Sequence, residues 1–233
     1  MTIPGSLTID DLTFEIRWST RRKTVGVTVD RDGQLIVHAP YSLSVGEIET
    51  VIREKQMWVY TTLARKESLQ HPQADREYVS GEGFYYLGRS YRLRIVSGAS
   101  QPLRLYRGWF ELQDTHQPDG RKAFINWYRM HGREHLVRHV ADFADRIGYY
   151  PADITVSSLG NRWGSCSKAG RLSFHWRTIL LPRKIVEYIV VHELSHLHEH
   201  RHNPEFWDRV ERVLPDWQQR ANWLTLHGAE YDL

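Results

Sequence analysis

Two histidines four residues apart, His192 and His196, stand near the C-terminus with Glu193 directly after the first of them. On an α-helix, positions i and i+4 lie on one face one turn apart, so both imidazoles can bind one metal ion. Glu193 is rotated by about 100° from His192, which places its carboxylate beside the ion rather than in its first shell. A carboxylate there can take a proton from a water that the metal activates. This H-E-x-x-H pattern therefore predicts metal-dependent hydrolysis.

A third ligand is expected because catalytic zinc usually takes three protein ligands and keeps one open position. His202 is the best candidate, although a straight helix would turn it about 240° away from His196. Asn203 is a favoured N-cap and Pro204 a favoured first residue of a new helix, so His202 is expected in a turn that can fold back. The alternative third ligand is a downstream carboxylate such as Glu205.

The competing interpretation of this motif is an amphipathic helix whose histidines are simply solvated. The flanking sequence Tyr188-Ile189-Val190-Val191, with Leu194 and Leu197, instead predicts a mostly buried helix. Buried histidines need a partner, and a metal ion is the natural one.

Composition narrows the class of protein. The 233 residues suffice for one large or two small domains, and 41% are hydrophobic. No apolar run approaches the roughly 18–20 residues that cross a membrane, and the N-terminus lacks a signal-peptide pattern. A single cysteine excludes an intramolecular disulfide, so we expect a cytoplasmic protein without a membrane partner. The net charge of +3 is only a weak indication of anionic partners.

Hydrophobic patterning predicts an α+β protein with a β-rich N-terminal half. A capping box at Ser44 and Glu47 starts a helix that runs to about residue 65. Turn-forming residues 114–120 mark the expected division, into a β-rich region with one helix, 1–116, and a catalytic region, 117–233. Expected strands of the first region are 24–29 and 34–37, which form a hairpin, then 84–87, 91–96 and 103–106.

The second region is expected to begin with a long helix over residues 121–147, whose apolar side chains follow helical spacing. Strands are expected at 154–157 and 172–181. The motif helix should run from about residue 182 to 199, and two short helices should close the chain.

Four segments in combination resemble one known family: Asn161-Arg162-Trp163-Gly164-Ser165-Cys166-Ser167, Leu180-Leu181-Pro182, Val190 to Leu197, and His202-Asn203-Pro204-Glu205-Phe206-Trp207. They resemble the YgjP-like predicted metal-dependent hydrolases of the zincin superfamily, which are similar to SprT and Wss1-like metalloproteases. The resemblance extends weakly into the N-terminal half. Family members usually carry Ser where this chain has Asn203, a departure that leaves the ligand histidine in place.

The resemblance implies a zincin-like fold and a set of roles. A twisted, mostly antiparallel sheet would be backed by the helix 121–147, and strand 172–181 would be the edge beside the cleft, able to hold an extended peptide. His192, His196 and His202 would bind one zinc ion, with other divalent metals possible. Glu193 would be the catalytic base.

Segment 162–167 has two interpretations. Arg162 or Ser165 contacts substrate in a cleft-lining loop, or a tight turn at Gly164 packs Trp163 and Cys166 into the core. Cys166 as a redox-sensitive residue or a fourth metal ligand is a weaker alternative, because a thiolate would close the open position.

Three functional hypotheses follow, and the first is a zinc-dependent metallopeptidase. No residue stands out as the oxyanion donor, and Tyr149, Tyr150 and Arg162 are named only as candidates. The second is a pyrophosphatase of nucleoside triphosphates such as UTP, an activity described for some YgjP-like proteins. Its phosphates would meet a basic surface of Arg17, Arg21, Arg22, Lys23, Arg89, Arg92, Arg94, Arg104 and Arg107. The third is a nucleic-acid-associated SprT-like protein.

Overall fold

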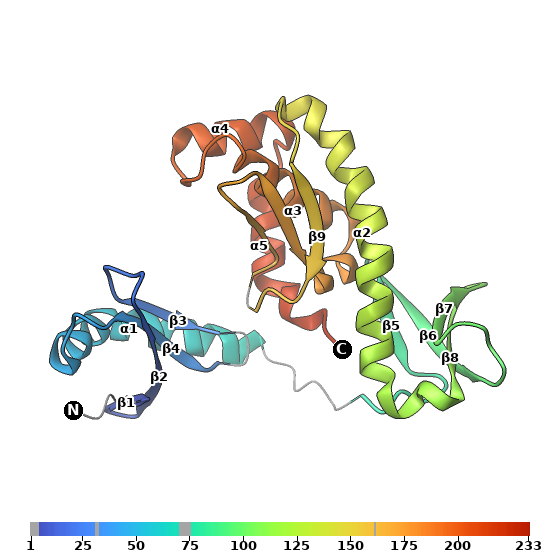
Figure 1. Ribbon diagram of the computed structural model, residues 1–233, viewed down its shortest axis with the longest axis horizontal. Coiled ribbons are helices and arrows are strands. Elements are labelled where there is room, and N and C mark those ends of the chain that lie inside the picture. Colours follow the sequence, from blue (N-terminus) through green and yellow to red (C-terminus); the bar gives the residue numbers. More distant parts are fainter. Residues whose placement is uncertain (1–4, 31–32, 70–75, 161) are drawn as a thin grey trace. The chain divides into compact units, whose positions relative to one another are not determined.

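The computed structural model describes residues 5–30, 33–69, 76–160 and 162–233 of an α+β protein (Figure 1). Asn161, the first residue of the quoted motif, lies outside these ranges, as does most of the polar connection near residue 72. The chain forms two compact units, Met1–Pro72 and Gln73–Leu233. The sequence had placed the division near residue 116, which instead falls inside the second unit.

The first unit is a four-stranded sheet with one helix. The strand order is β1-β2-β4-β3, with β2 and β4 parallel and the expected hairpin formed by β3 and β4. Ser44 and Glu47 form the predicted capping box, in which the Ser44 amide donates to the Glu47 carboxylate at 2.7 Å. The elements are β1 Ser6–Ile9, β2 Leu12–Ser19, β3 Gly26–Val29, β4 Leu35–Pro40 and α1 Val45–Leu69.

The second unit begins with a sheet whose inner face packs on the long helix α2 (Gly120–Ile147). The Phe84 and Phe124 rings stack with centroids 4.0 Å apart, and Phe110 meets Trp127 edge-on at 5.0 Å. This aromatic contact joins the sheet to the C-terminal region, which explains why no domain boundary lies between them. The strands are β5 Gly83–Tyr86, β6 Arg89–Val96, β7 Leu103–Tyr106 and β8 Trp109–Gln113, in the order β5-β6-β8-β7.

A three-stranded sheet follows, in the order β10-β11-β9, built from β9 Asp153–Ser157, β10 Gly164–Cys166 and β11 Arg171–His175. It corrects three expectations. The strand expected over 172–181 ends at His175, because the His175 imidazole caps a 3-10 helix, Trp176–Leu180. That strand is central, and the two edge strands are β10 and β9. One of the two pairings, β9 with β11, is parallel, so the sheet is not mostly antiparallel.

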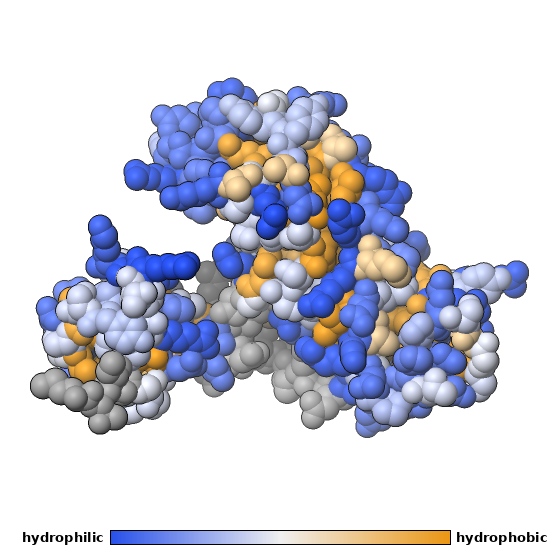
Figure 2. Space-filling view, in the orientation of Figure 1, coloured by the Kyte–Doolittle hydropathy of each residue, from blue (hydrophilic) through white to orange (hydrophobic). Residues whose placement is uncertain are grey.

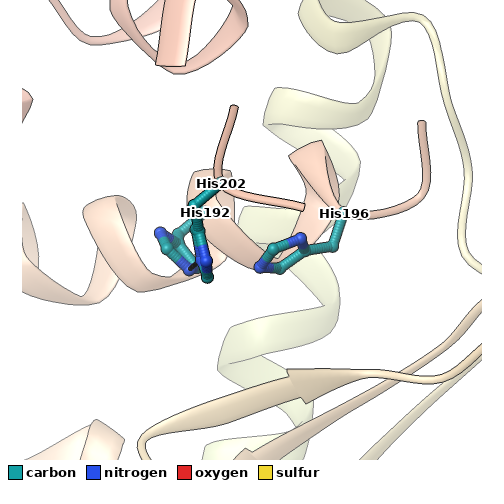
Figure 3. A group of neighbouring side chains, drawn as sticks. All are labelled: His192, His196 and His202. Atoms are coloured by element: carbon teal, nitrogen blue, oxygen red, sulfur yellow. Dashed lines mark hydrogen bonds between the residues drawn. The ribbon is translucent and has the colours of Figure 1, made fainter. Parts of the chain in front are cut away.

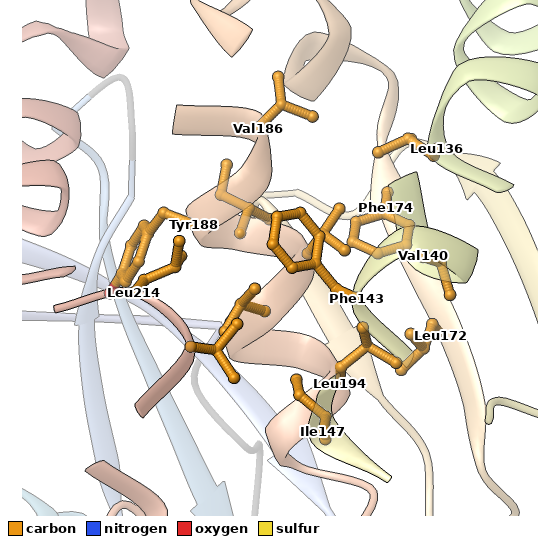
Figure 4. Close-up of a cluster of buried hydrophobic side chains, with 14 of the residues drawn as sticks. Leu136, Val140, Phe143, Ile147, Leu172, Phe174, Val186, Tyr188, Leu194 and Leu214 are labelled. Atoms are coloured by element: carbon orange, nitrogen blue, oxygen red, sulfur yellow. The ribbon is translucent and has the colours of Figure 1, made fainter. Parts of the chain in front are cut away.

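Helix α3 (Arg183–Ser195) carries the histidine motif and packs against α2 through the largest core cluster (Figure 4). Val140 and Phe143 of α2 belong to the same buried cluster as Val186 and Leu194 of α3, and each such buried side chain stabilises the fold by roughly 1.5–3 kcal/mol. The two predicted closing helices are α4 (Pro204–Val213) and α5 (Trp217–His227).

Apolar and hydrophilic residues occupy different parts of the surface of the second unit. Apolar residues gather over the part of the second unit that holds α3 and β9, and hydrophilic residues follow the outer side of α2 (Figure 2). Among the described residues, no helix is both long and apolar enough to span a bilayer.

A pair of histidines on α2 gives a pH-dependent stability. Burial, with the nearby charges of His139, Arg138 and Arg183, lowers the pKa of His135 to about 4. In the unfolded chain that pKa is about 6.5. The unfolded state therefore binds more protons as pH falls from about 6.5 towards 4, and the free energy of unfolding falls over that range.

His135→Gln should lose less stability than the wild type between pH 7 and pH 5 in urea titrations. Equal losses in both proteins would contradict this origin.

Candidate metal centre

Three imidazoles converge at the end of α3 (Figure 3). His192 lies in its last turn, His196 caps it, and His202 comes from the loop before α4. One ring nitrogen from each lies within 4.8 Å of the others, and the Nε2 atoms of His192 and His202 are 3.1 Å apart. Elsewhere in the described ranges, no three His, Cys, Asp or Glu side chains form such a cluster. The structure thus brings together the three histidines that the sequence singled out.

The chain returns to the cluster because α3 ends early. It ends at Ser195 rather than at residue 199, and the amides of Leu197 and Glu199 close tight turns on Leu194 and Ser195. The new helix begins as predicted, with Asn203 Oδ1 accepting from the Phe206 amide at 3.0 Å. Between these two ends the backbone reverses and places His202 opposite His192.

Neighbouring groups fix the ring orientations. His196 Nδ1 lies 3.0 Å from the Glu199 carbonyl oxygen, so a proton on Nδ1 leaves Nε2 free as a ligand. Metal-binding histidines are commonly held in this way. The buried Phe206 ring lies beneath all three imidazoles, with centroids 4.5 to 5.0 Å from theirs. The ring of Trp207 stacks on His202 and on Trp217.

The cluster is suited to a divalent metal, and two of its imidazoles have lowered pKa values. Burial, followed by the charges of His196 and His202, lowers the pKa of His192 to about 3. Burial also lowers the pKa of His196. The Nε2 atoms of His192 and His202 face each other at 3.1 Å, so either a shared proton or a cation can lie between them. Three nitrogens with an open side are the donor set of catalytic zinc sites. Tetrahedral zinc needs nitrogens about 3.3 Å apart, which small side-chain rotations from the observed positions would supply.

Glu193 packs against the edge strand β10. Its side chain is buried, and burial raises the pKa of Glu193 to about 8, an effect that the positive charge of Arg162 partly offsets. A Cβ atom built on Gly164 would lie 2.6 Å from Glu193 Oε1. Gly164 is therefore a strand residue that leaves room for this carboxylate, and not the tight turn that the sequence suggested.

A cavity of about 640 Å³ contains these groups, and both expected substrate contacts, Arg162 and Ser165, line it. Trp163 and Cys166 line it too, and both also pack against the core. Its remaining lining residues are Gly164, Lys168, Tyr188, Ile189, His192, Glu193, His196, His200, His202 and Leu224.

The structure also locates the residues proposed as a fourth metal ligand and as oxyanion donors. Cys166 is not part of the histidine cluster, and burial, with the nearby Glu193, raises the pKa of its thiol to about 11. Tyr149 and Tyr150 are not among the cavity-lining residues, since Tyr149 contacts His198 and Tyr150 contacts Asp145.

Sequence reasoning missed Tyr188, which lines the cavity one helical turn before His192. Its spacing of four residues from His192 was the signal that could have identified it, because it places both side chains on one face.

Residues 23–227 match the protein family described as "YgjP-like, metallopeptidase domain". Among solved structures, the chain is similar to the metallopeptidase zymogen abylysin of Pyrococcus abyssi, with 24% identity and a TM-score of 0.35. That likeness covers 37% of this chain and 89% of abylysin. No curated protein matches the chain.

The contact between Gly164 and Glu193 gives a test of the site. In Gly164→Ala the added methyl group must displace the Glu193 carboxylate. We expect hydrolytic activity to fall at least tenfold while the histidines still bind metal, as measured by metal content after dialysis. The matched control is Gly46→Ala in α1, where the added methyl group meets no atom within 4 Å and activity should be kept. Full activity in Gly164→Ala would show that the position of Glu193 does not matter.

Proposed function

Because the chain belongs to the YgjP-like metallopeptidase family, we propose that it is a zinc-dependent peptide hydrolase with Glu193 as general base. The observation that carries this proposal is the placement of a buried carboxyl beside three converging imidazoles in one cavity. The single cysteine favours a reducing compartment, the cytoplasm, as its location.

His192, His196 and His202 would hold the ion. Three imidazoles suit zinc, although other divalent metals accept the same ligands. A divalent ion supplies Lewis acidity, polarising a carbonyl oxygen and lowering the pKa of a water molecule.

Glu193 is suited to moving protons in this cavity. Its burial holds the pKa at about 8, and an added cation lowers that pKa towards neutrality. A base with a pKa near the working pH is the most effective. In the proposed reaction, Glu193 accepts a proton from the attacking water and delivers it to the nitrogen of the leaving amine.

Other cavity residues would bind the peptide. β10 is an edge strand of its sheet and lines the cavity, so an extended chain can pair with its free backbone groups. Arg162 and Ser165 would contact the peptide beside this edge. The Tyr188 hydroxyl is the proposed donor to the oxygen that becomes negatively charged during attack.

Nucleoside triphosphate hydrolysis is the second candidate, because Arg162 and Lys168 line the same cavity. Guanidinium and ammonium groups bind phosphate oxygens. The same Glu193 would then activate water for attack at phosphorus.

The decisive experiment compares wild type with Glu193→Gln. We expect the wild type to cleave peptides from an unbiased library, and the variant to lose several orders of magnitude in rate with its zinc content unchanged. UTP and other nucleoside triphosphates are assayed in parallel. Pyrophosphate release without peptide cleavage would select the second candidate, and full activity of Glu193→Gln would refute the assigned base.

Tyr188 is tested separately. Tyr188→Phe keeps the ring that packs in the core but removes the hydroxyl. We expect kcat to fall about 10- to 100-fold with KM and zinc content little changed, since the hydrogen bond would form in the transition state. An unchanged kcat would leave Tyr188 as a packing residue.

A further inference from the structure

The outer face of the sheet β5–β8 carries arginines and aromatic rings in register. Arg92 pairs with Trp109 across the parallel strands β6 and β8, and Tyr106 pairs with Trp109 across β7 and β8. In the next row, Arg94 and Arg104 flank Glu111. Residues that pair directly across strands share a face, so all six lie on the side opposite the Phe110 core. We call them, together with Arg107 of the β7–β8 turn, the arginine–aromatic face.

Two of the arginines on this face, Arg94 and Arg104, are held in place by neighbouring side chains. Glu111, whose side chain is only 7% exposed, binds Arg104 at 2.6 Å and Arg94 at 3.7 Å. The Arg94 guanidinium lies 4.6 Å from the Trp109 ring, and that of Arg104 lies 4.9 Å from the ring of Tyr106. The side chains of Arg94 and Arg104 remain 49% and 41% exposed, and Tyr106 is 45% exposed. Four arginines against one glutamate leave this face with a charge of +3.

The turn between β7 and β8 adds a conformational observation. Arg107 has φ of 47° and Gly108 has φ of 82°. A two-residue hairpin with both φ positive prefers Asn-Gly, so arginine is an unfavourable choice for the fold. The similar turn at Leu87 is explained by packing, because the Leu87 side chain is partly buried against the core. Arg107 is exposed and instead places its guanidinium 5.3 Å from the Tyr106 ring.

We propose that the arginine–aromatic face binds single-stranded nucleic acid. Guanidinium groups that a buried carboxylate orients can donate to phosphate oxygens, while the aromatic rings and guanidinium planes stack on unpaired bases. A sheet face suits a single strand, whose bases are free to splay out, better than the grooves of a duplex. The face shares no residue with the cavity of the metal centre, so this inference is independent of the proposed hydrolysis.

The basic residues that the sequence singled out as a phosphate-binding surface divide accordingly. Arg17, Arg21, Arg22 and Lys23 lie in the first unit, whereas the arginine–aromatic face is defined by residues of the second unit. Arg89 pairs with Tyr86 and therefore alternates to the other side of the sheet.

The test uses the full-length protein and a labelled 15-nucleotide oligo(dT), with the dissociation constant measured by fluorescence anisotropy at several salt concentrations. The variant Arg92→Gln/Arg107→Asn removes two exposed charges and gives the turn a residue that it favours. We expect it to keep its Tm and peptide hydrolysis, to bind at least tenfold more weakly, and to show a salt slope shallower by about 1.4. The control Arg138→Gln/Arg212→Gln makes the same charge change on α2 and α4 and should bind like the wild type.

Two further probes separate the binding modes. An abasic oligonucleotide with the same number of phosphates should bind at least fivefold more weakly, because it cannot stack. Polyglutamate should bind more weakly still. The proposal would be overturned if the protein did not bind oligo(dT), if both double variants weakened binding equally, or if the abasic strand bound with equal affinity. Tighter binding of polyglutamate would also overturn it and would indicate an acidic protein partner instead.

Discussion

The end of helix α3 at Ser195 is the constraint on which the site depends. Two histidines one turn apart present two nitrogens to one point, but a continuing helix would carry the next histidines away from it. The turns after Ser195 and the cap at Asn203 reverse the chain, so that His202 completes the set. Burial lowers the pKa of His192 and of His196, which favours the uncharged form that binds metal. We expect folding and metal binding to be coupled at this point.

The rest of the second unit holds that arrangement from three sides. Helix α2 packs behind α3 through the main core, the Phe206 ring supports the imidazoles, and β10 lies against Glu193. The absent side chain of Gly164 lets the sheet edge approach the carboxylate closely enough to bury it. The same approach adds to the burial that raises the pKa of Glu193, and it brings the proposed peptide-binding edge beside the proposed base.

Much of this could be predicted from local sequence. Helical spacing identified α2 and the histidine pair, and the cap at Asn203 predicted the turn that carries His202. These signals act within a few residues, which is why they are visible in a single chain. The family resemblance, confirmed over residues 23–227, supplied the class of enzyme.

What could not be predicted depends on contacts between distant segments. The 3-10 helix after His175 and the central place of β11 follow from tertiary pairing, and the clearance between Gly164 and Glu193 joins residues 29 positions apart. The unit boundary was misplaced for a similar reason. Turn-forming residues near 116 indicate a break in local structure, but Phe110 and Phe124 on either side pack together.

X-ray absorption spectroscopy of the zinc-loaded protein tests the central claim most directly. The account predicts three imidazole nitrogens at about 2.0–2.1 Å from the metal, with one of them lost in His202→Ala. A sulfur neighbour at about 2.3 Å, or a spectrum unchanged in His202→Ala, would contradict it.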